Sequence, residues 1–138
     1  MLQIELMSWK HAQPLASAIR LAVFVEEQGV PPELEMDEFD PKSLHALAVQ
    51  DGEAVGTARL LPDGHIGRMA VLKPWRGRGI GSRLLVAMVQ AARTRGETRA
   101  MLSAQVHALA FYRAHGFQAE GPVYEEAGIP HQAMTLAF

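Results

Sequence analysis

Three glycines and two arginines stand together in the segment Arg76–Ser82, which reads RGRGIGS. Glycine lets a backbone pass close to a ligand with its N–H groups turned outward. An amphipathic segment follows, and the N-terminus of a helix offers unpaired N–H groups and the positive end of the helix dipole. The segment therefore predicts a binding site for a phosphate or a pyrophosphate.

Two other glycine-rich phosphate sites do not fit this segment. A P-loop needs a Lys followed by Ser or Thr after its last glycine, whereas Gly81 is followed by Ser82 and Arg83. A dinucleotide fingerprint needs a third glycine where Ser82 stands, and it is expected near the start of a βαβ unit. The pattern that remains is Arg-x-x-Gly-x-Gly, formed by Arg76, Gly79 and Gly81.

A strand and a helix must position this loop. His65–Leu72 reads as a strand and is followed by the breaker Pro74. Apolar residues then recur at helical spacing from Ile80 to Ala92, and Gly96 is a plausible helix stop. The loop is thus expected to join the end of a strand to the beginning of a helix.

A second patterned segment lies downstream. Ala100–Ala104 predicts a short buried strand, and Val106–His115 predicts a short helix that Gly116 ends. Gln105–Phe117 resembles the Asn-x-x-Ala-x-x-x-Tyr-x-x-x-Gly-Phe segment of the GCN5-related N-acetyltransferase superfamily, whose pyrophosphate loop carries the Arg-x-x-Gly-x-Gly pattern. Gln105 stands where asparagine is usual, and it keeps the amide on a longer side chain. Because both motifs occur in the expected order, the chain is identified as a member of that superfamily.

The two ends of the chain resemble the ElaA-like branch of this superfamily. The matching residues are Arg20–Gln28, Asp37, Asp40, His45, Gly128–His131 and Met134. With them the resemblance covers nearly the whole chain. The N-terminal part is also similar to acyl-homoserine-lactone synthases, but such an activity needs a second substrate, S-adenosylmethionine, for which this chain is short.

The resemblance implies an α/β (α+β) fold, formed by a single N-acetyltransferase domain over residues 1–138. Its sheet is expected to be mixed and mostly antiparallel, with about six to seven strands flanked by helices. The residue patterns agree with this class, since turn residues separate short apolar runs. Besides the segments above, they predict a helical region Pro14–Gln28 and strands at Gln3–Met7, Leu44–Gln50, Ala54–Leu61, Phe117–Tyr124 and Gln132–Phe138.

For the donor, the resemblance implies acetyl-CoA (coenzyme A as the carrier). The strand around Met69–Val71 would bond the pantetheine arm through its backbone, at a place where these folds splay apart from the next strand. The Met69 N–H is the candidate donor to the thioester oxygen, because an oxyanion develops there. The cofactor-binding residues are then expected to be Met69, Ala70, Val71, Arg76, Gly77, Arg78, Gly79, Ile80, Gly81, Ser82, Gln105, Ala108 and Phe111.

For catalysis, Tyr112 matches the superfamily tyrosine that protonates the departing sulfur as general acid. His65 stands, counting back from the glycine loop, where members with a carboxylate base often place it, and it is the candidate general base. Its other interpretation is an exposed strand end. The branch motifs offer Glu27 and His131 as alternative bases, and a water chain to bulk solvent is another. The candidate substrate-binding residues are Glu27, Gln28 and His131.

Charge is segregated along the chain. Seven acids and no lysine or arginine lie between Leu21 and Pro41, whereas Lys73, Arg76 and two further arginines gather around the glycine loop. The basic cluster suits an anionic cofactor. The acidic segment is interpreted either as a guide for a cationic amine or as a solvated surface loop.

The composition limits the class of protein. The chain has 138 residues, a net charge of −2 and no cysteine. This length is enough for one domain with a core, and the near-zero charge argues against nucleic-acid binding. Without cysteine there is no disulfide, thiolate metal site or cysteine acyl-enzyme, and no metal is expected. No apolar run could span a membrane and no secretory signal precedes Glu5, so a cytoplasmic protein is expected.

The sequence thus predicts an acetyl-CoA-dependent N-acetyltransferase that transfers the acetyl group directly to a primary amine in a ternary complex. A small-molecule acceptor is favoured over a protein. The alternative is a non-catalytic acyl-CoA-binding sensor or regulatory module, and the intact Tyr112 favours catalysis over it. The oligomeric state is left open, with a homodimer as one alternative.

Overall fold

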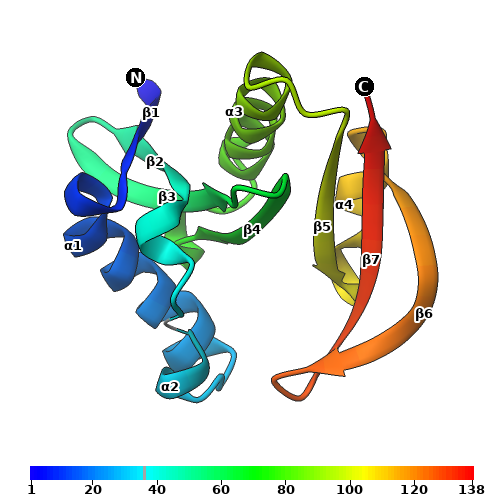
Figure 1. Cartoon of the computed structure of the whole chain (residues 1–138). Coiled ribbons are helices and arrows are strands. Elements are labelled where there is room, and N and C mark those ends of the chain that lie inside the picture. Colours follow the sequence, from blue (N-terminus) through cyan, green and yellow to red (C-terminus); the bar gives the residue numbers. More distant parts are fainter. Residues whose placement is uncertain (36) are drawn as a thin grey trace.

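The structure is a computed structural model, and it describes residues 1–35 and 37–138. Its centre is a seven-stranded sheet in the order β1-β2-β3-β4-β5-β7-β6 (Figure 1). Neighbouring strands are antiparallel except for β4 and β5, which are parallel. The predicted mixed, mostly antiparallel fold is therefore confirmed. The strands are β1 (Leu2–Ser8), β2 (Leu44–Gln50), β3 (Glu53–Leu60), β4 (His65–Val71), β5 (Arg99–Gln105), β6 (Gln118–Glu126) and β7 (Ile129–Ala137).

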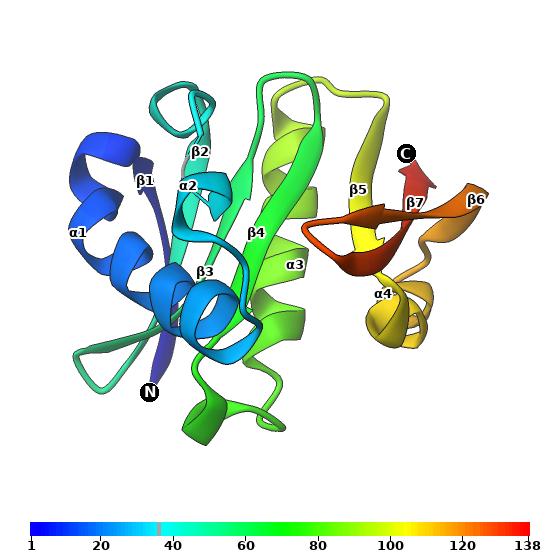
Figure 2. The same cartoon turned by 90° about the horizontal axis from the view of Figure 1, so that it is seen from below.

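Helices cover both faces of the sheet (Figure 2). On β2, Ala46 and Ala48 pack in the cluster that contains α3, whereas Leu47 packs in the cluster that contains α1. Successive strand residues point to opposite faces, so one strand serves both cores. The helices are α1 (Trp9–Arg20) with a π-helical continuation (Leu21–Glu27), α2 (Pro32–Glu35), α3 (Ile80–Thr94) and α4 (Leu109–Ala114), with 3₁₀ turns at Asp40–Lys42, Lys73–Trp75 and Val106–Ala108.

Helix α1 begins at Trp9, so the predicted start near Pro14 is wrong. The buried stripe of this helical region is Ala12, Ala16, Ile19 and Val23, each at most 4% exposed, and it begins before the proline. Proline inside a helix costs a backbone hydrogen bond. Burial of the alanine stripe against the sheet outweighs that cost, which a local breaker rule cannot foresee.

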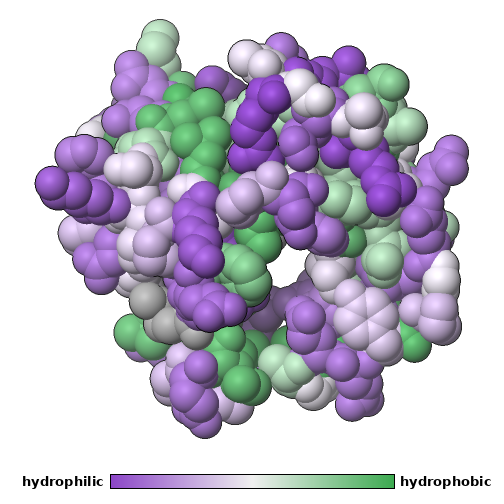
Figure 3. Space-filling model, viewed as in Figure 1, coloured by the Kyte–Doolittle hydropathy of each residue, from purple (hydrophilic) through white to green (hydrophobic). Residues whose placement is uncertain are grey.

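Strands β4 and β5 pair at one end only. Their register comprises His65 with Met101 and Ile66 with Leu102, and beyond these pairs the two strands separate. Against β3, strand β4 also carries an extra residue, and Arg68 has a φ of +48° at this bulge. Figure 3 shows an opening on this face, between the half with α1 and α2 and the half with β5–β7. The splay that the resemblance implied is therefore present.

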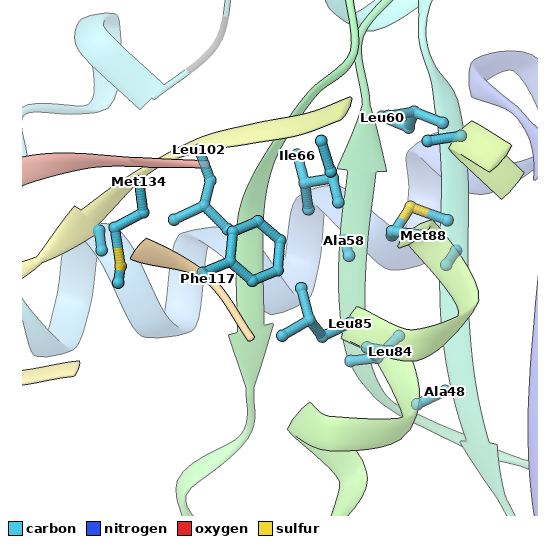
Figure 4. Packing of buried hydrophobic residues seen from close by; sticks show 14 of the residues in the cluster. Ala48, Ala58, Leu60, Ile66, Leu84, Leu85, Met88, Leu102, Phe117 and Met134 are labelled. Carbon is cyan, nitrogen blue, oxygen red and sulfur yellow. The ribbon is translucent and has the colours of Figure 1, made fainter. Parts of the chain in front are cut away.

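One core cluster joins the two halves behind the splay. Phe117 is 2% exposed and belongs to the same cluster as Leu102 and Met134 from the C-terminal half and Leu84 and Leu85 from α3 (Figure 4). These contacts fix how far the strands separate, because a packed interior resists changes in shape.

The β6–β7 hairpin is longer than the sequence predicted. Its turn residues Ala127 and Gly128 both have positive φ, at +53° and +76°. Two such residues form the type I′ turn that suits hairpins, which sequence rules recognise by Asn or Asp before the glycine. Because Ala127 gives no such signal, the prediction starts this strand near Gln132, whereas β7 begins at Ile129.

Within the described residues, no helix has the length and hydropathy that a membrane crossing needs.

Candidate active site

The splayed strands open into a cleft of about 1260 Å³. Its walls come from the glycine loop and α3, from β4 and the end of β5, from α4, from the π-helical segment and from the β6–β7 turn. All the predicted site residues except Arg78 line it. The Arg78 guanidinium lies over the Trp75 ring instead, 4.9 Å from its centroid.

The glycine loop leads into α3 in the way that a phosphate site requires. Gly77 and Gly79 have φ values of +77° and +79°, and Gly79 is the residue that caps α3. The first N–H groups of a helix have no partner within the helix. Ile80, Gly81 and Ser82 form this first turn and line the cleft, so the unpaired N–H groups and the helix dipole are available to an anion there.

Replacing Gly79 with alanine is expected to lower the free energy of unfolding by about 1–2 kcal/mol, because an L-residue pays for the left-handed backbone. We also expect weaker coenzyme A binding, since the loop must shift. Gly81→Ala is the matched control: its Cβ would meet only the Phe111 ring at 3.6 Å, an ordinary contact. Thermal unfolding and calorimetric titration measure both effects, and equal behaviour of the two variants would contradict the argument.

The Arg76 side chain is held by protein atoms. Its two terminal nitrogens donate to the Glu27 carboxylate at 2.6 and 2.7 Å, and its Nε donates to the Val71 carbonyl at 2.9 Å. The hydrogen bond from Arg76 holds the pKa of Glu27 below its usual value. In this structure Glu27 is thus a paired carboxylate rather than a free base, and the backbone N–H groups are the unpaired donors of the loop.

On β4, Met69, Ala70 and Val71 form the wall nearest the glycine loop. Ala70 is 4% exposed and packs against α1, as expected for a core side chain. The bulge at Arg68 immediately precedes Met69, and this stretch lacks a β5 partner. Backbone groups on this edge are therefore placed where a ligand arm could pair with them.

Tyr112 projects from α4 into the same cleft, beside Ala108 and Phe111. Its ring meets Phe111 and Phe117 edge to face, with centroids 5.1 and 6.2 Å apart. Within the described chain its hydroxyl makes no hydrogen bond. Burial raises the pKa of Tyr112 to about 12, so the phenol is protonated at neutral pH.

Gln28 and Gln105 meet across the cleft. The Gln105 amide nitrogen donates to Gln28 at 2.9 Å, and the Gln28 amide nitrogen donates back at 3.3 Å. His107 contacts the same Gln105 oxygen at 2.6 Å through Nε2. The sequence prediction assigns Gln28 and Gln105 to substrate and cofactor separately, whereas the fold joins them in one bridge. His107 lines the cleft as well.

Of the three histidines that line the cleft, the two candidate bases have different surroundings. His65 is at the exposed start of β4, with 47% of its side chain accessible, and its Nδ1 lies 2.9 Å from the Asp63 carboxylate. His131 is buried on β7, where its Nδ1 lies 2.7 Å from the Ile129 carbonyl oxygen and its Nε2 lies 3.7 Å from Glu126. Both histidines among the candidate bases are therefore at the cleft, as is the third candidate, Glu27.

Two acids of the acidic segment are buried rather than solvated. Glu35 and Asp40 are 4% and 1% exposed, and both bind the buried Arg20 guanidinium. Asp40 accepts hydrogen bonds from Arg20 at 2.8 and 3.0 Å and from Arg59 at 2.9 Å. Burial alone would raise the pKa of Asp40, but the hydrogen bonds and charges of both arginines outweigh it and hold the pKa below its usual value.

Asp37 extends this network to the cleft. It accepts hydrogen bonds from Arg59 at 2.7 and 2.8 Å and from Arg68 at 3.2 Å. Burial opposes ionisation of Asp37, but the two arginines prevail and lower its pKa. The interpretation as a solvated loop is therefore wrong for Glu35 and Asp40. No local spacing signals the network, because its arginines come from α1, β3 and β4.

A glycine loop at a helix start, a parallel strand pair that splays beside it and a tyrosine across the gap are together typical of an acyl-CoA-dependent acyltransferase of the GCN5-related type. Residues 12–138 match the family model described as acetyltransferase (GNAT) domain. The chain belongs to this family of acetyltransferases.

Known proteins of the family resemble the chain over most of its length. It is 40% identical over 121 residues to the uncharacterized N-acetyltransferase YjcF of Bacillus subtilis, across 84% of this chain and 86% of that protein. It is 33% identical over 125 residues to protein ElaA of Escherichia coli, across 85% and 82%. The crystal structure of an acyl-CoA N-acyltransferase from Pseudomonas aeruginosa superimposes with a TM-score of 0.89 at 33% identity, covering 99% of this chain and 100% of that one. The resemblance to ElaA is therefore confirmed.

Proposed function

We propose that the protein transfers the acetyl group of acetyl-CoA directly to a small primary amine. One observation carries the proposal: the glycine loop, the splayed edge of β4 and the Tyr112 phenol line a single cleft. In that arrangement the loop would hold the pyrophosphate of coenzyme A. The free edge at Met69–Val71 would pair with the pantetheine arm, and the thioester would lie between this edge and α4.

The acetyl transfer needs two proton transfers, one to the leaving sulfur and one from the attacking nitrogen. A neutral amine attacks the thioester carbon, so a C–N bond forms and the C–S bond breaks. The Met69 N–H would stabilise the oxyanion that develops during this step. Tyr112 would give its proton to the leaving thiolate, and the resulting tyrosinate would take a proton from the attacking nitrogen. The products are the acetylated amine and free coenzyme A.

Side chains and the hairpin turn narrow the cleft through which the acceptor would approach. The Gln28–Gln105 bridge crosses it, and Glu126 and Ala127 of the hairpin turn form part of its wall. This enclosure supports a small molecule rather than a protein as acceptor. A general base is needed because amines are mostly protonated near neutral pH, and His65 and His131 are the two candidates at the cleft.

Acceptor-dependent release of free thiol from acetyl-CoA tests the proposal. The full chain is incubated with acetyl-CoA and a panel of primary amines, and mass spectrometry identifies the product. Release with stoichiometric acetylated amine supports the proposal. Coenzyme A binding without release on any amine would instead support the sensor, and release driven by S-adenosylmethionine would support a synthase.

A further inference from the structure

We propose that Glu126 and His131, on the two strands of the β6–β7 hairpin, receive the ammonium group of the acceptor and remove its proton. The inference rests on the proposed function, because it assigns the acceptor end of the same cleft. It also specifies the substrate class, a primary amine that reaches the enzyme as a cation.

The His131 ring is held in one tautomer. Its Nδ1 lies 2.7 Å from the Ile129 carbonyl oxygen, and a carbonyl oxygen only accepts hydrogen bonds. Nδ1 therefore carries a proton and donates it, which leaves the lone pair of the neutral ring on Nε2. The side chain is 9% exposed and lines the cleft. The fold thus fixes Nε2 of His131 as the nitrogen that can accept a proton.

Glu126 is the carboxylate that can bind a cation here. Four acids line the cleft, and three of them, Glu27, Glu35 and Asp37, form ion pairs with arginine. Among the described residues, Glu126 has no lysine or arginine partner. Its side chain is 57% exposed, and its carboxylate lies 3.7 Å from Nε2 of His131. This separation is too long for a direct hydrogen bond, so Nε2 keeps its lone pair.

Neighbouring strands hold the His131 ring in place. The Tyr124 ring stacks on it with centroids 6.1 Å apart and an angle of 23°, and the Tyr124 hydroxyl bonds the Ser103 hydroxyl on β5. On its other side, His131 is paired in the sheet with Gln105 of β5. The titratable groups around the ring are therefore Glu126 and Tyr124 from β6, with His107 bonded to Gln105 beyond them.

The same pairing places His131 beside the donor end of the cleft. Gln105 is the last residue of β5, and the chain continues from it through Val106–Ala108 into α4, which carries Tyr112. His131 and Tyr112 both line the space between β4 and β5. Base and acid would thus act from adjoining walls, one on the amine and one on the sulfur.

The proton transfer is balanced within these groups. The ammonium ion binds at the Glu126 carboxylate and gives one proton to Nε2 of His131, so a neutral amine and an imidazolium form. The nearby carboxylate stabilises this positive charge. After the acetyl transfer, the imidazolium releases its proton to water at the exposed side of Glu126, and the ring returns to its starting state.

His65 is the competing base, and it is more exposed to water than His131. Its side chain is 47% exposed, and the Asp63 carboxylate 2.9 Å from Nδ1 leaves the lone pair of the neutral ring on Nε2. The two histidines therefore share one tautomer and differ in burial, since the His131 side chain is 9% exposed and has the Glu126 carboxylate beside its basic nitrogen. The two histidines can be separated by experiment.

The test compares His131→Asn with His65→Ala in the thiol-release assay. Asparagine can still donate to the Ile129 carbonyl but has no basic nitrogen. We expect His131→Asn to lower kcat/KM for the amine about a hundredfold near pH 7, with unchanged acetyl-CoA affinity. The loss should shrink as the pH approaches the amine pKa, because the acceptor then arrives neutral. His65→Ala should keep the pH–rate profile of the unaltered chain.

Glu126→Gln supplies a second, surface variant that does not threaten the fold. We expect it to raise KM for a cationic amine about fivefold, with a smaller effect on kcat. An unchanged pH–rate profile in His131→Asn would overturn this inference and leave the proposed function standing. If His131→Asn does not fold, an unchanged KM in Glu126→Gln would do the same. No amine-dependent release by the unaltered chain would overturn the proposed function and this inference with it.

Discussion

Replacing Arg20 with methionine is expected to lower the free energy of unfolding by about 3–5 kcal/mol. Arg20 is 1% exposed and neutralises Glu35 and Asp40, which are buried as well. Methionine fills similar space but leaves both carboxylates without their main partner. An unpaired buried charge loses its hydration without compensation, which is why breaking such a pair costs far more than the pair contributes.

Arg76→Met is the matched control, because it removes an arginine from an ion pair of similar geometry. The Arg76 and Glu27 side chains are 40% and 36% exposed, so water solvates the remaining carboxylate. Its cost should stay below about 1 kcal/mol. Urea unfolding of both variants measures the difference, and losses of equal size would refute a special role for burial.

The same network sets a pH dependence of stability. The folded chain holds the pKa of Asp37 and Asp40 below the unfolded value of 3.8, so it binds fewer protons than the unfolded chain near that pH. The stability contribution is therefore present above about pH 4 and is lost as the pH falls through the folded pKa values. In Arg20→Met this acid-induced loss should be smaller, since Asp40 loses a partner that lowers its pKa.

Local sequence patterns predicted the parts of this protein that depend on backbone geometry. The glycine loop, the helix that begins at Ile80 and the strand from His65 all follow from residue types at fixed spacing. The family resemblance added the mixed sheet and the splay of β4 from β5. The glycine-loop side of the cleft was therefore foreseeable.

Long-range pairing could not be predicted in this way. Three arginines, Arg20, Arg59 and Arg68, lie on three separate elements. Only the fold brings them to the acids Glu35 and Asp37. A run of acids without local bases is normally solvated, so the sequence pattern pointed to the surface. The bridge between Gln28 and Gln105 spans 77 residues and has the same explanation. Side chains that pair across elements leave no periodic signal.

Replacing Tyr112 with phenylalanine is expected to lower kcat by about a hundredfold or more, the typical contribution of a positioned general acid. Acetyl-CoA affinity should change little, because the ring keeps its contacts with Phe111 and Phe117. Initial rates with a confirmed acceptor, together with a binding titration, separate the two effects. An unchanged kcat would exclude Tyr112 as the general acid.

Stability at high pH gives this variant a second readout that is independent of turnover. Burial raises the Tyr112 pKa to about 12, whereas the unfolded phenol ionises near 10. Between these values the folded chain holds a proton that the unfolded chain has released, so stability falls as the pH rises. Tyr112→Phe should remove this fall while keeping the fold intact below pH 10. If Tyr112→Phe lowers kcat and also removes the alkaline sensitivity, Tyr112 of the unaltered chain is a protonated phenol at the cleft. If it lowers kcat and unfolds at neutral pH, Tyr112 has a packing role instead.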